Sequence, residues 1–212
     1  MQLHRSDVVT KAAHILDEFG IADLTMRRLA RELSVTPGAL YWHFADKQEL
    51  LGAVADRILE PAVPDVAALP WAQRISTIGA ALREALLSST DGAELVSATF
   101  ASGRSAALAR ILDLLAAAAS DAGFETTNAA LAARTIVYYV LGFTVDEQSR
   151  LQWDAAGALP DGQSVLTSNP NGRFAFGMRL LVDGMSAQHT VSPDDGASPD
   201  EGVDTGVTVP TA

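Results

Sequence analysis

The residues that could do chemistry gather between positions 27 and 47, where cationic and aromatic side chains stand close together. Arginine and lysine bind phosphate oxygens, to which a tyrosine hydroxyl or an imidazole can also donate, and ring edges can touch thymine methyl groups. Residues of these types at such short spacings indicate contact with nucleic acid. The candidate DNA-binding residues are Arg27, Arg28, Thr36, Pro37, Gly38, Tyr41, Trp42, His43 and Lys47.

Two very short helices around a tight turn must position these side chains. Thr25 is a good N-cap for the first helix, whose apolar stripe leaves most of the arginines on its other side. Ser34 and Val35 break the helical pattern. Thr36 can then cap a second helix, and Pro37 suits its first position, where a backbone N–H would have no partner within the helix.

Two interpretations of this second helix compete. Leu40 and Phe44 lie one helical turn apart and point to the core in both. In the first, the segment is a small helical hairpin with core aromatics and solvated arginines. This hairpin is disfavoured by Tyr41, Trp42 and His43, because no single helix buries three consecutive bulky residues on one face. The second is a helix-turn-helix, whose second helix is slim enough for a major groove about 12 Å wide.

The composition predicts a globular, all-helical protein. The chain has 212 residues, 48% hydrophobic content and a mean hydropathy of +0.15. Its β-branched runs are short, and no period-2 segment lies between hairpin turns. The lack of cysteine excludes disulfides and thiolate metal sites. Because there is no signal region and no unbroken run of about 18 apolar residues, we expect a cytoplasmic protein without membrane contact.

The net charge of −11 is unevenly distributed along the chain. Residues 1–48 hold six basic and six acidic side chains, so this block is neutral and the whole excess lies beyond it. Local charge decides phosphate contact, and Arg27, Arg28 and Lys47 cluster around the second short helix. With few phosphate contacts per subunit, we expect affinity to depend on dimerisation and on fit to the bases.

The chain divides into three parts. Residues 1–46 form a three-helix DNA-binding domain, with a first helix over 6–19 that stops at Gly20. Residues 47–190 form a larger helical domain for ligand binding and dimerisation, with further helices at 71–88, 93–101, 105–122, 127–153 and 172–188. Its first segment, 47–60, is a connector helix capped by Asp46, with Glu49 completing a capping box. Residues 191–212 carry five acidic and no basic residues and are expected to be a disordered acidic tail.

Two of the later helices are apolar enough to form a homodimer interface. The segment 131–145 is apolar on almost every side, and the helix at 172–188 has an apolar stripe with Gly177 and Gly184 along another face. Together they could form a four-helix bundle with their copies, although both could instead be interior helices of a monomer. The candidate interface residues are Tyr139, Phe143, Phe174, Met178, Leu181 and Met185.

The motif at 24–51 resembles that of the tetracycline-repressor (TetR) family of bacterial regulators. The matching text is Leu24-Thr25, Leu29-Ala30, Leu33-Ser34-Val35, the run from Leu40 to Phe44, and the run from Lys47 to Leu51. Weaker matches at 82–93, 142–148 and 174–188 resemble the tetracycline-repressor branch itself. The resemblance implies a dimer on a palindromic operator, where Arg27 would read a guanine edge and Lys47 would hold a phosphate. It also implies a small-molecule cavity within residues 60–150.

This sequence departs from the resemblance at the positions that bind tetracycline. Where those repressors carry polar and metal-chelating groups, the matching positions here are mostly apolar. Only Thr99 and an acidic residue at Asp146 or Glu147 keep the same type of side chain. We therefore expect no tetracycline–magnesium complex, no metal and no cofactor, but a lipophilic effector anchored by a few polar groups. The candidate ligand-binding residues are Val63, Ile78, Leu82, Val96, Thr99, Phe100, Arg104, Tyr138 and Glu147.

The resulting hypothesis is a repressor that a small effector releases from its operator. The effector would act through the Pro61 end of the connector helix, beside Val63, and change the spacing of the two DNA-binding domains in the dimer. A ligand-independent DNA-binding or partner-binding protein, with its pocket collapsed around Phe100 and Phe143, is the main alternative. An enzyme is not expected, because no phosphate loop or nucleophile motif occurs and the histidines lack metal-ligand spacing. These histidines are His4, His14, His43 and His189.

Overall fold

A computed structural model describes residues 3–159 and 169–190, and the tail expected at 191–212 lies outside this range. The described chain consists of helices, which confirms the predicted all-α class. The end of the molecule that is expected to bind DNA, called the DNA-binding end below, contains α1 (Arg5–Asp23), α2 (Met26–Glu32) and α3 (Pro37–Tyr41). Helix α4 (Lys47–Leu59) follows, with a 3₁₀ turn at Glu60–Ala62. The body contains α5 (Trp71–Leu87), α6 (Gly92–Phe100), α7 (Ala106–Asp121), α8 (Thr126–Ala155) and α9 (Pro170–Thr190).

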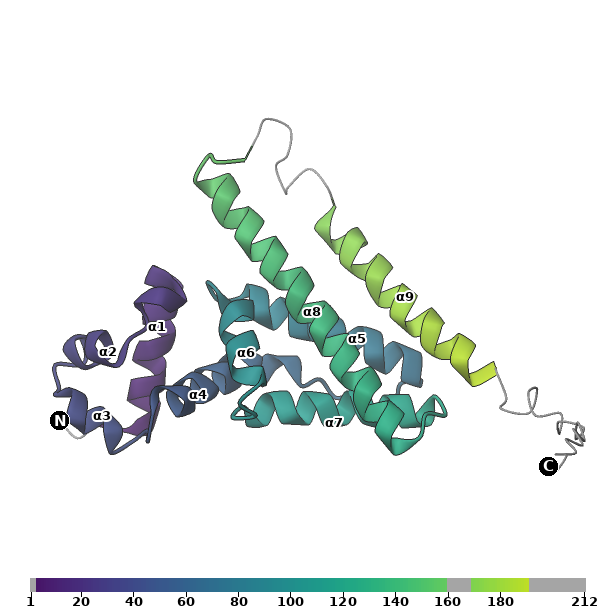
Figure 1. Ribbon diagram of the computed structural model, residues 1–212, viewed down its shortest axis with the longest axis horizontal. Coiled ribbons are helices and arrows are strands. Elements are labelled where there is room, and N and C mark those ends of the chain that lie inside the picture. The colour runs from purple at the N-terminus through teal and green to yellow at the C-terminus, as the bar shows by residue number, and fades with distance from the viewer. Residues whose placement is uncertain (1–2, 160–168, 191–212) are drawn as a thin grey trace, which may run out of the picture.

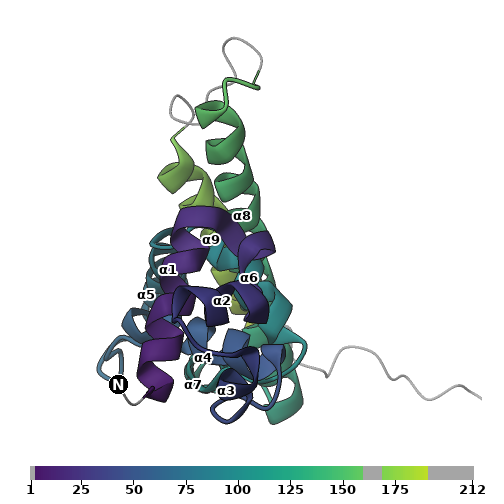
Figure 2. The same ribbon diagram turned by 90° about the vertical axis from the view of Figure 1, so that its left-hand side faces the viewer.

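The first three helices form a separate group at one end of the molecule, and α4 leads from it into the body (Figure 1). Turning the molecule places α1, α2 and α3 in front of the other helices (Figure 2). Helix α4 packs against α1 on one side and against α5, α6 and α7 on the other. A change in the packing of the body can therefore reach the DNA-binding end through α4.

Local chemistry explains where the first helices begin and end. Gly20 leaves the helical conformation, with φ 77° and ψ 175°, and α1 runs on to Asp23 only across this kink. The Thr25 side chain accepts from the backbone N–H of Arg28 at 3.1 Å, as expected for an N-cap. Asp46 caps α4 by accepting from the N–H of Glu49 at 2.8 Å. The expected capping box differs in one bond, because Glu49 reaches back to the N–H of Ala45, at 2.7 Å.

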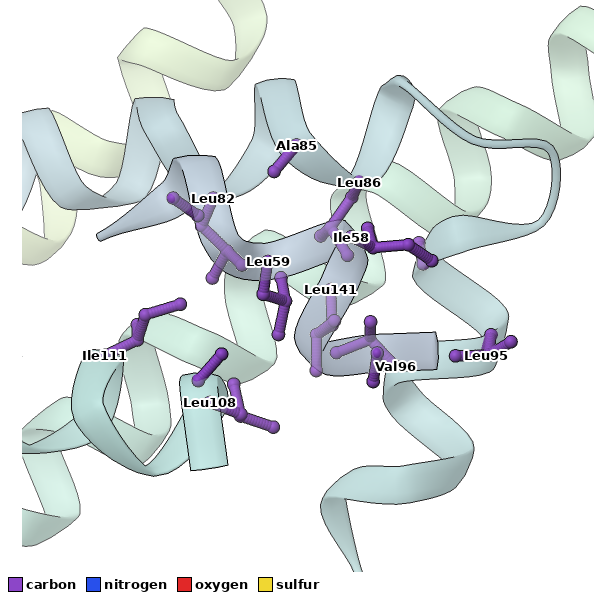
Figure 3. Close-up of a cluster of buried hydrophobic side chains, with 14 of the residues drawn as sticks. Ile58, Leu59, Leu82, Ala85, Leu86, Leu95, Val96, Leu108, Ile111 and Leu141 are labelled. Carbon is purple, nitrogen blue, oxygen red and sulfur yellow. The ribbon is translucent and has the colours of Figure 1, made fainter. Parts of the chain in front are cut away.

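The core of the body is filled with aliphatic side chains from five helices. Figure 3 shows Leu59 of α4, Leu82 of α5, Val96 of α6, Ile111 of α7 and Leu141 of α8 converging on one cluster. Four of these residues are fully buried and Leu141 is 4% exposed. Full burial of such a side chain contributes about 1.5–3 kcal/mol, so this cluster holds α4 to the body.

Helix α8 is long and apolar, and it is the one described helix that could span a membrane by length and composition. Its buried face packs on α5, α6 and α7, which explains the same composition in a core helix. The opposite face leaves large apolar side chains in solvent, among them Leu131 and Tyr138, each 56% exposed. This segment, apolar on almost every side in the sequence, is thus buried on one side only within a single chain.

Candidate functional site

The end of α3 presents large aromatic side chains to solvent. Leu40 and Phe44 are fully buried, whereas Tyr41 is 52% and Trp42 is 90% exposed, and His43 is half-buried. The helix covers only five residues, Pro37–Tyr41, so it ends before Phe44, which the sequence spacing places one helical turn after Leu40. It ends early because Trp42 and His43 form a turn in which both the N–H of His43 and that of Phe44 bond the carbonyl of Leu40.

The cationic candidates occupy two different environments. Arg27 and Lys47 are exposed, as are Thr36, Pro37 and Gly38 beside the aromatic pair. Arg28 instead pairs with Asp23 at 2.6 Å, lies 3.7 Å above the ring of Phe19 and keeps only 19% of its side chain exposed. The structure therefore leaves seven of the nine DNA-binding candidates exposed and His43 half-buried, and it commits Arg28 to contacts within the domain.

The loop between α6 and α7 contacts α4 along much of its length. A Cβ on Gly52 would lie 2.5 Å from the carbonyl oxygen of Arg104, so only glycine permits this approach. Asp56 Oδ1 accepts from Ser105 Oγ and from the N–H of Ala107, both at 2.8 Å, which places its carboxylate at the N-terminus of α7. The Arg104 guanidinium extends to Asp46 at 3.2 Å. This loop thus holds the connector helix at its start and near its end.

A second contact joins the end of α1 to the loop between α5 and α6. Asp91 Oδ2 accepts from the N–H of Ile21 at 2.9 Å, and Asp91 Oδ1 accepts from Gln152 of α8 at 2.6 Å. Thr90 Oγ1 donates to the carbonyl of Asp17 at 2.9 Å. The DNA-binding end is therefore tied to the body through α1 as well as through α4.

The nine ligand-binding candidates do not converge on one site. Ile78, Leu82, Val96 and Thr99 are fully buried in the core, where Thr99 Oγ1 donates to the carbonyl of Val96 at 2.9 Å. Val63 is half-buried and packs at the edge of that core. Of the four polar anchors expected from the sequence, Thr99 thus shares the core with the apolar candidates, and the other three lie elsewhere.

Three of those anchors are engaged by other groups. Arg104 is on the surface against α4, paired with Asp46. Tyr138 is exposed and meets the half-buried Phe100 edge to face, with ring centroids 5.3 Å apart. Arg134 lies 4.8 Å above the ring of Phe100, so the end of α6 is covered by an aromatic and cationic cluster from α8.

Glu147 is the third, and it belongs to a buried ion pair that sequence reasoning missed. Arg83 of α5 donates to both its carboxylate oxygens, at 2.9 and 2.6 Å, and to Asn171 of α9 at 2.9 Å. The two charged side chains are 13% and 8% exposed. The pair ties three helices together, and no spacing in the sequence links Arg83 with a partner 64 residues away.

The six interface candidates mostly pack α9 on its own chain. Phe174, Met178 and Met185 are 5%, 4% and 8% exposed, while Tyr139, Phe143 and Leu181 are half-buried. Tyr139 stacks on Phe174 and donates its hydroxyl to the Phe174 carbonyl at 2.9 Å, and its burial raises the pKa of its hydroxyl above the usual value. A Cβ on Gly177 would overlap the Tyr139 ring, which explains this glycine.

The other face of α8 and α9 is apolar and open. Besides the exposed residues of α8, it presents Phe176 and Leu180 of α9, 56% and 57% exposed. Gly142 and Gly184 have open space where a Cβ would be. A groove of about 370 Å³ runs between the two helices, lined by Leu131, Leu180 and their neighbours. Such a contiguous apolar face on two long helices is typical of a protein–protein interface.

Comparison with known proteins identifies the family. The model for bacterial regulatory proteins of the tetR family matches residues 8–54, and that for the tetracyclin repressor-like C-terminal domain matches residues 63–159. The class E tetracycline repressor of Escherichia coli is 31% identical over an alignment of 202 positions, which covers 88% of this chain and 92% of that protein. The chain belongs to the TetR family. The resemblance seen in the sequence is therefore confirmed.

Two solved structures of TetR-like regulators are more similar still. Mycobacterium smegmatis BioQ is 61% identical with a TM-score of 0.82, covering 88% of this chain and 99% of its own. A BioQ crystal structure with its natural double-stranded DNA operator is 59% identical with a TM-score of 0.77 and the same coverage. As a TetR-family member, the chain is a transcriptional regulator that binds operator DNA as a homodimer.

Proposed function

We propose that this TetR-family protein is a repressor that reads a palindromic operator through the surface around α3 and is released by a small, largely apolar effector. The observation that carries the proposal is the exposure of Tyr41 and Trp42 beside Arg27 and Lys47. Among residues 3–159 and 169–190, no contact accounts for an indole that is 90% exposed. A major groove offers thymine methyl groups and phosphates to these side chains.

Each exposed residue has a distinct role in this proposal. Arg27 reads a guanine edge, and Lys47, at the first turn of α4, holds a phosphate. Tyr41 and His43 donate to phosphates, while Trp42 touches base or sugar edges. Thr36, Pro37 and Gly38 line the approach, and Arg28 supports the domain from within.

The lack of net positive charge at the DNA-binding end limits non-specific affinity. Residues 1–48 are neutral overall within a chain of charge −11. Each phosphate neutralised adds about 0.9 to the slope of log affinity against log salt, so a small slope is expected. Most of the affinity would then come from the presence of two DNA-binding ends in one dimer. They would lie about 34–36 Å apart, as in other helix-turn-helix dimers.

The open face of α8 and α9 is the proposed dimer interface. Leu131, Phe176 and Leu180 supply its apolar area, and Gly142 and Gly184 allow the partner's helices to approach closely. The six residues predicted from the sequence lie beneath this face and shape it. A four-helix bundle formed with the partner's α8 and α9 would cover the groove between them.

The effector is proposed to enter the core beneath α6, between α5, α7 and α8. Ile78, Leu82 and Val96 close this region to solvent, so a lipophilic molecule must part these helices to bind. Among residues 3–159 and 169–190, no group of three or more acidic or histidine side chains could hold a metal.

The proposed coupling between the effector site and the DNA-binding end runs through the loop between α6 and α7. The sequence placed this link near Val63, but the contacts on α4 favour Arg104 and Ser105 instead. A displacement of α6 by the effector would pull the loop away from Asp46 and Asp56 and so free α4 to turn. A coupling of about 3 kcal/mol between effector and operator would weaken operator binding about a hundredfold.

The test uses two aromatic variants and a matched control. Tyr41→Ala and Trp42→Ala should each abolish preference for the BioQ operator duplex over a scrambled duplex and leave the dimer intact. Trp153→Ala removes another exposed indole, 59% exposed at the far end of α8, and should bind as the unaltered protein does. Loss of fold or dimer in the α3 variants would instead assign these residues to the core.

One observation favours a second candidate, a DNA-binding regulator that needs no effector. The core positions Ile78, Leu82 and Val96 are fully buried as they stand. A thermal-shift screen of lipophilic compounds separates the two, since only an effector-responsive protein gains stability that rises with ligand concentration. In either case we propose a cytoplasmic, non-enzymatic protein.

A further inference from the structure

The segment between α3 and α4 carries two of the proposed DNA contacts but has little structure of its own. Trp42 and His43 follow a helix of five residues, which is too short to be stable in isolation. Within the segment, the backbone bonds of His43 and Phe44 both go to Leu40. Side chains from elsewhere must therefore fix the direction in which this turn presents its indole and imidazole.

Arg5, the first residue of α1, makes two contacts with this turn and one with α4. Its Nη1 donates to the carbonyl oxygen of His43 and to Glu49 Oε1, the latter at 2.9 Å. Its guanidinium also lies 4.0 Å from the centre of the Phe44 ring, which is fully buried. One side chain thus joins α1, the end of the turn and the first turn of α4.

Glu49 completes the arrangement from the other side. While Oε1 accepts from Arg5, Oε2 accepts from the backbone N–H of Ala45 at 2.7 Å. The Ala45 N–H and the Arg5 guanidinium keep the pKa of this carboxyl below its usual value, so Glu49 is charged near neutral pH. Arg5 therefore holds the carbonyl of His43, and its partner Glu49 holds the backbone N–H of Ala45.

We propose that Arg5 and Glu49 are positioning residues that clamp the turn after α3 in its DNA-reading conformation, without contacting DNA themselves. The proposal rests on the proposed operator contacts of Trp42 and His43. A fixed turn loses less conformational freedom when it binds, so the clamp raises operator affinity through preorganisation. The charged pair is partly exposed, 49% and 32%, and its main effect is on the shape of the turn.

A direct contact between Arg5 and phosphate is the competing explanation, because half of this side chain is exposed. The salt dependence of binding separates the two. Removing a phosphate contact lowers the slope of log affinity against log salt by about 0.9, whereas removing a positioning contact lowers affinity at every salt concentration and leaves the slope unchanged.

The experiment measures affinity for the BioQ operator duplex at several salt concentrations, with amide hydrogen exchange of the free protein. Arg5→Ala and Glu49→Ala should each weaken binding about tenfold with an unchanged slope, and the double variant should show about the same loss, because both remove one clamp. Exchange at Ala45 should quicken in all three. Arg5→Lys should recover part of the affinity, since an ammonium can bond either acceptor but lacks the planar fork.

Arg57→Ala is the matched control. Arg57 also joins α4 to α1, by donating to Thr10 Oγ1 at 3.1 Å, but at the end away from the turn. It should leave affinity and Ala45 exchange unchanged. A slope reduced by about one in Arg5→Ala, additive losses in the double variant, or full affinity with slow Ala45 exchange in either single variant would each overturn the proposal. If the unaltered protein shows no preference for the operator duplex, the proposed function fails, while the exchange measurement still tests the clamp.

Discussion

Replacing Asp56 with alanine tests the coupling between the body and the DNA-binding end. Its carboxylate accepts two hydrogen bonds at the N-terminus of α7, from Ser105 Oγ and the N–H of Ala107. Asp56→Ala removes both and leaves that N–H without its partner. Asp56→Asn keeps an acceptor oxygen but loses the charge, so the pair of variants separates the hydrogen bonds from the electrostatic effect.

The expected magnitude follows from these contacts. Hydrogen bonds to charged groups contribute about 1.5–3 kcal/mol and a carboxylate at a helix N-terminus about 0.3–1 kcal/mol. Because Asp56 is half-buried and water can replace part of the interaction, we take about 2 kcal/mol for Asp56→Ala and about 1 kcal/mol for Asp56→Asn. For a chain of this size these losses lower Tm by roughly 4–8 °C and 2–4 °C.

The assay combines thermal unfolding with operator binding. Asp56→Ala should also weaken operator affinity about three- to tenfold, because α4 is no longer fixed against the loop before α7. Asp113→Ala, which removes an exposed carboxylate from α7 itself, serves as the control and should change stability by less than about 0.5 kcal/mol. An Asp56→Ala protein that keeps both its Tm and its operator affinity would refute the role assigned to this contact.

Three further outcomes are expected. Glu147→Ala leaves Arg83 buried without its ion-pair partner and should lower the free energy of unfolding by about 3–5 kcal/mol in chemical denaturation. Gly177→Ala places a methyl group against the ring of Tyr139, so it should destabilise the α8–α9 contact by about 1–3 kcal/mol, and an unchanged midpoint would contradict the observed packing. Glu49 has a lowered pKa, so its contribution to stability is present above its ordinary value of 4.5 and is lost as pH falls through the lowered value. The stability gap between the unaltered protein and Glu49→Gln should therefore be present above pH 4.5 and close as the pH falls below that value.

The features that could be predicted from the sequence are those set by local spacing. The caps at Thr25 and Asp46, the break at Gly20 and the buried pair of Leu40 and Phe44 each depend on residues within a few positions of one another. The helices of the body also begin and end within two residues of the expected positions. Capping and apolar periodicity act over one or two turns, which is why they are visible in a single sequence.

The features that could not be predicted join residues far apart in the chain. Arg83 meets Glu147 across 64 positions and Asp56 meets Ser105 across 49, and polar residues of this kind occur on many exposed helix faces. Arg104 was assigned to a ligand pocket as a polar anchor, whereas its side chain turns to Asp46 at the start of α4. Only the folded packing decides which of several polar residues finds a partner.

Helix α9 is only partly buried within one chain, and this affects how the stability of the protein depends on its concentration in the cell. Helix α9 packs mainly on α5 and α8, and its outer side leaves Phe176 and Leu180 in water. In the proposed dimer the second subunit supplies a large share of the burial that keeps α9 in place, so stability becomes a function of protein abundance. Below the concentration at which subunits pair, the lone chain would be open to proteolysis along α9, so scarcity would remove the regulator faster than dilution alone.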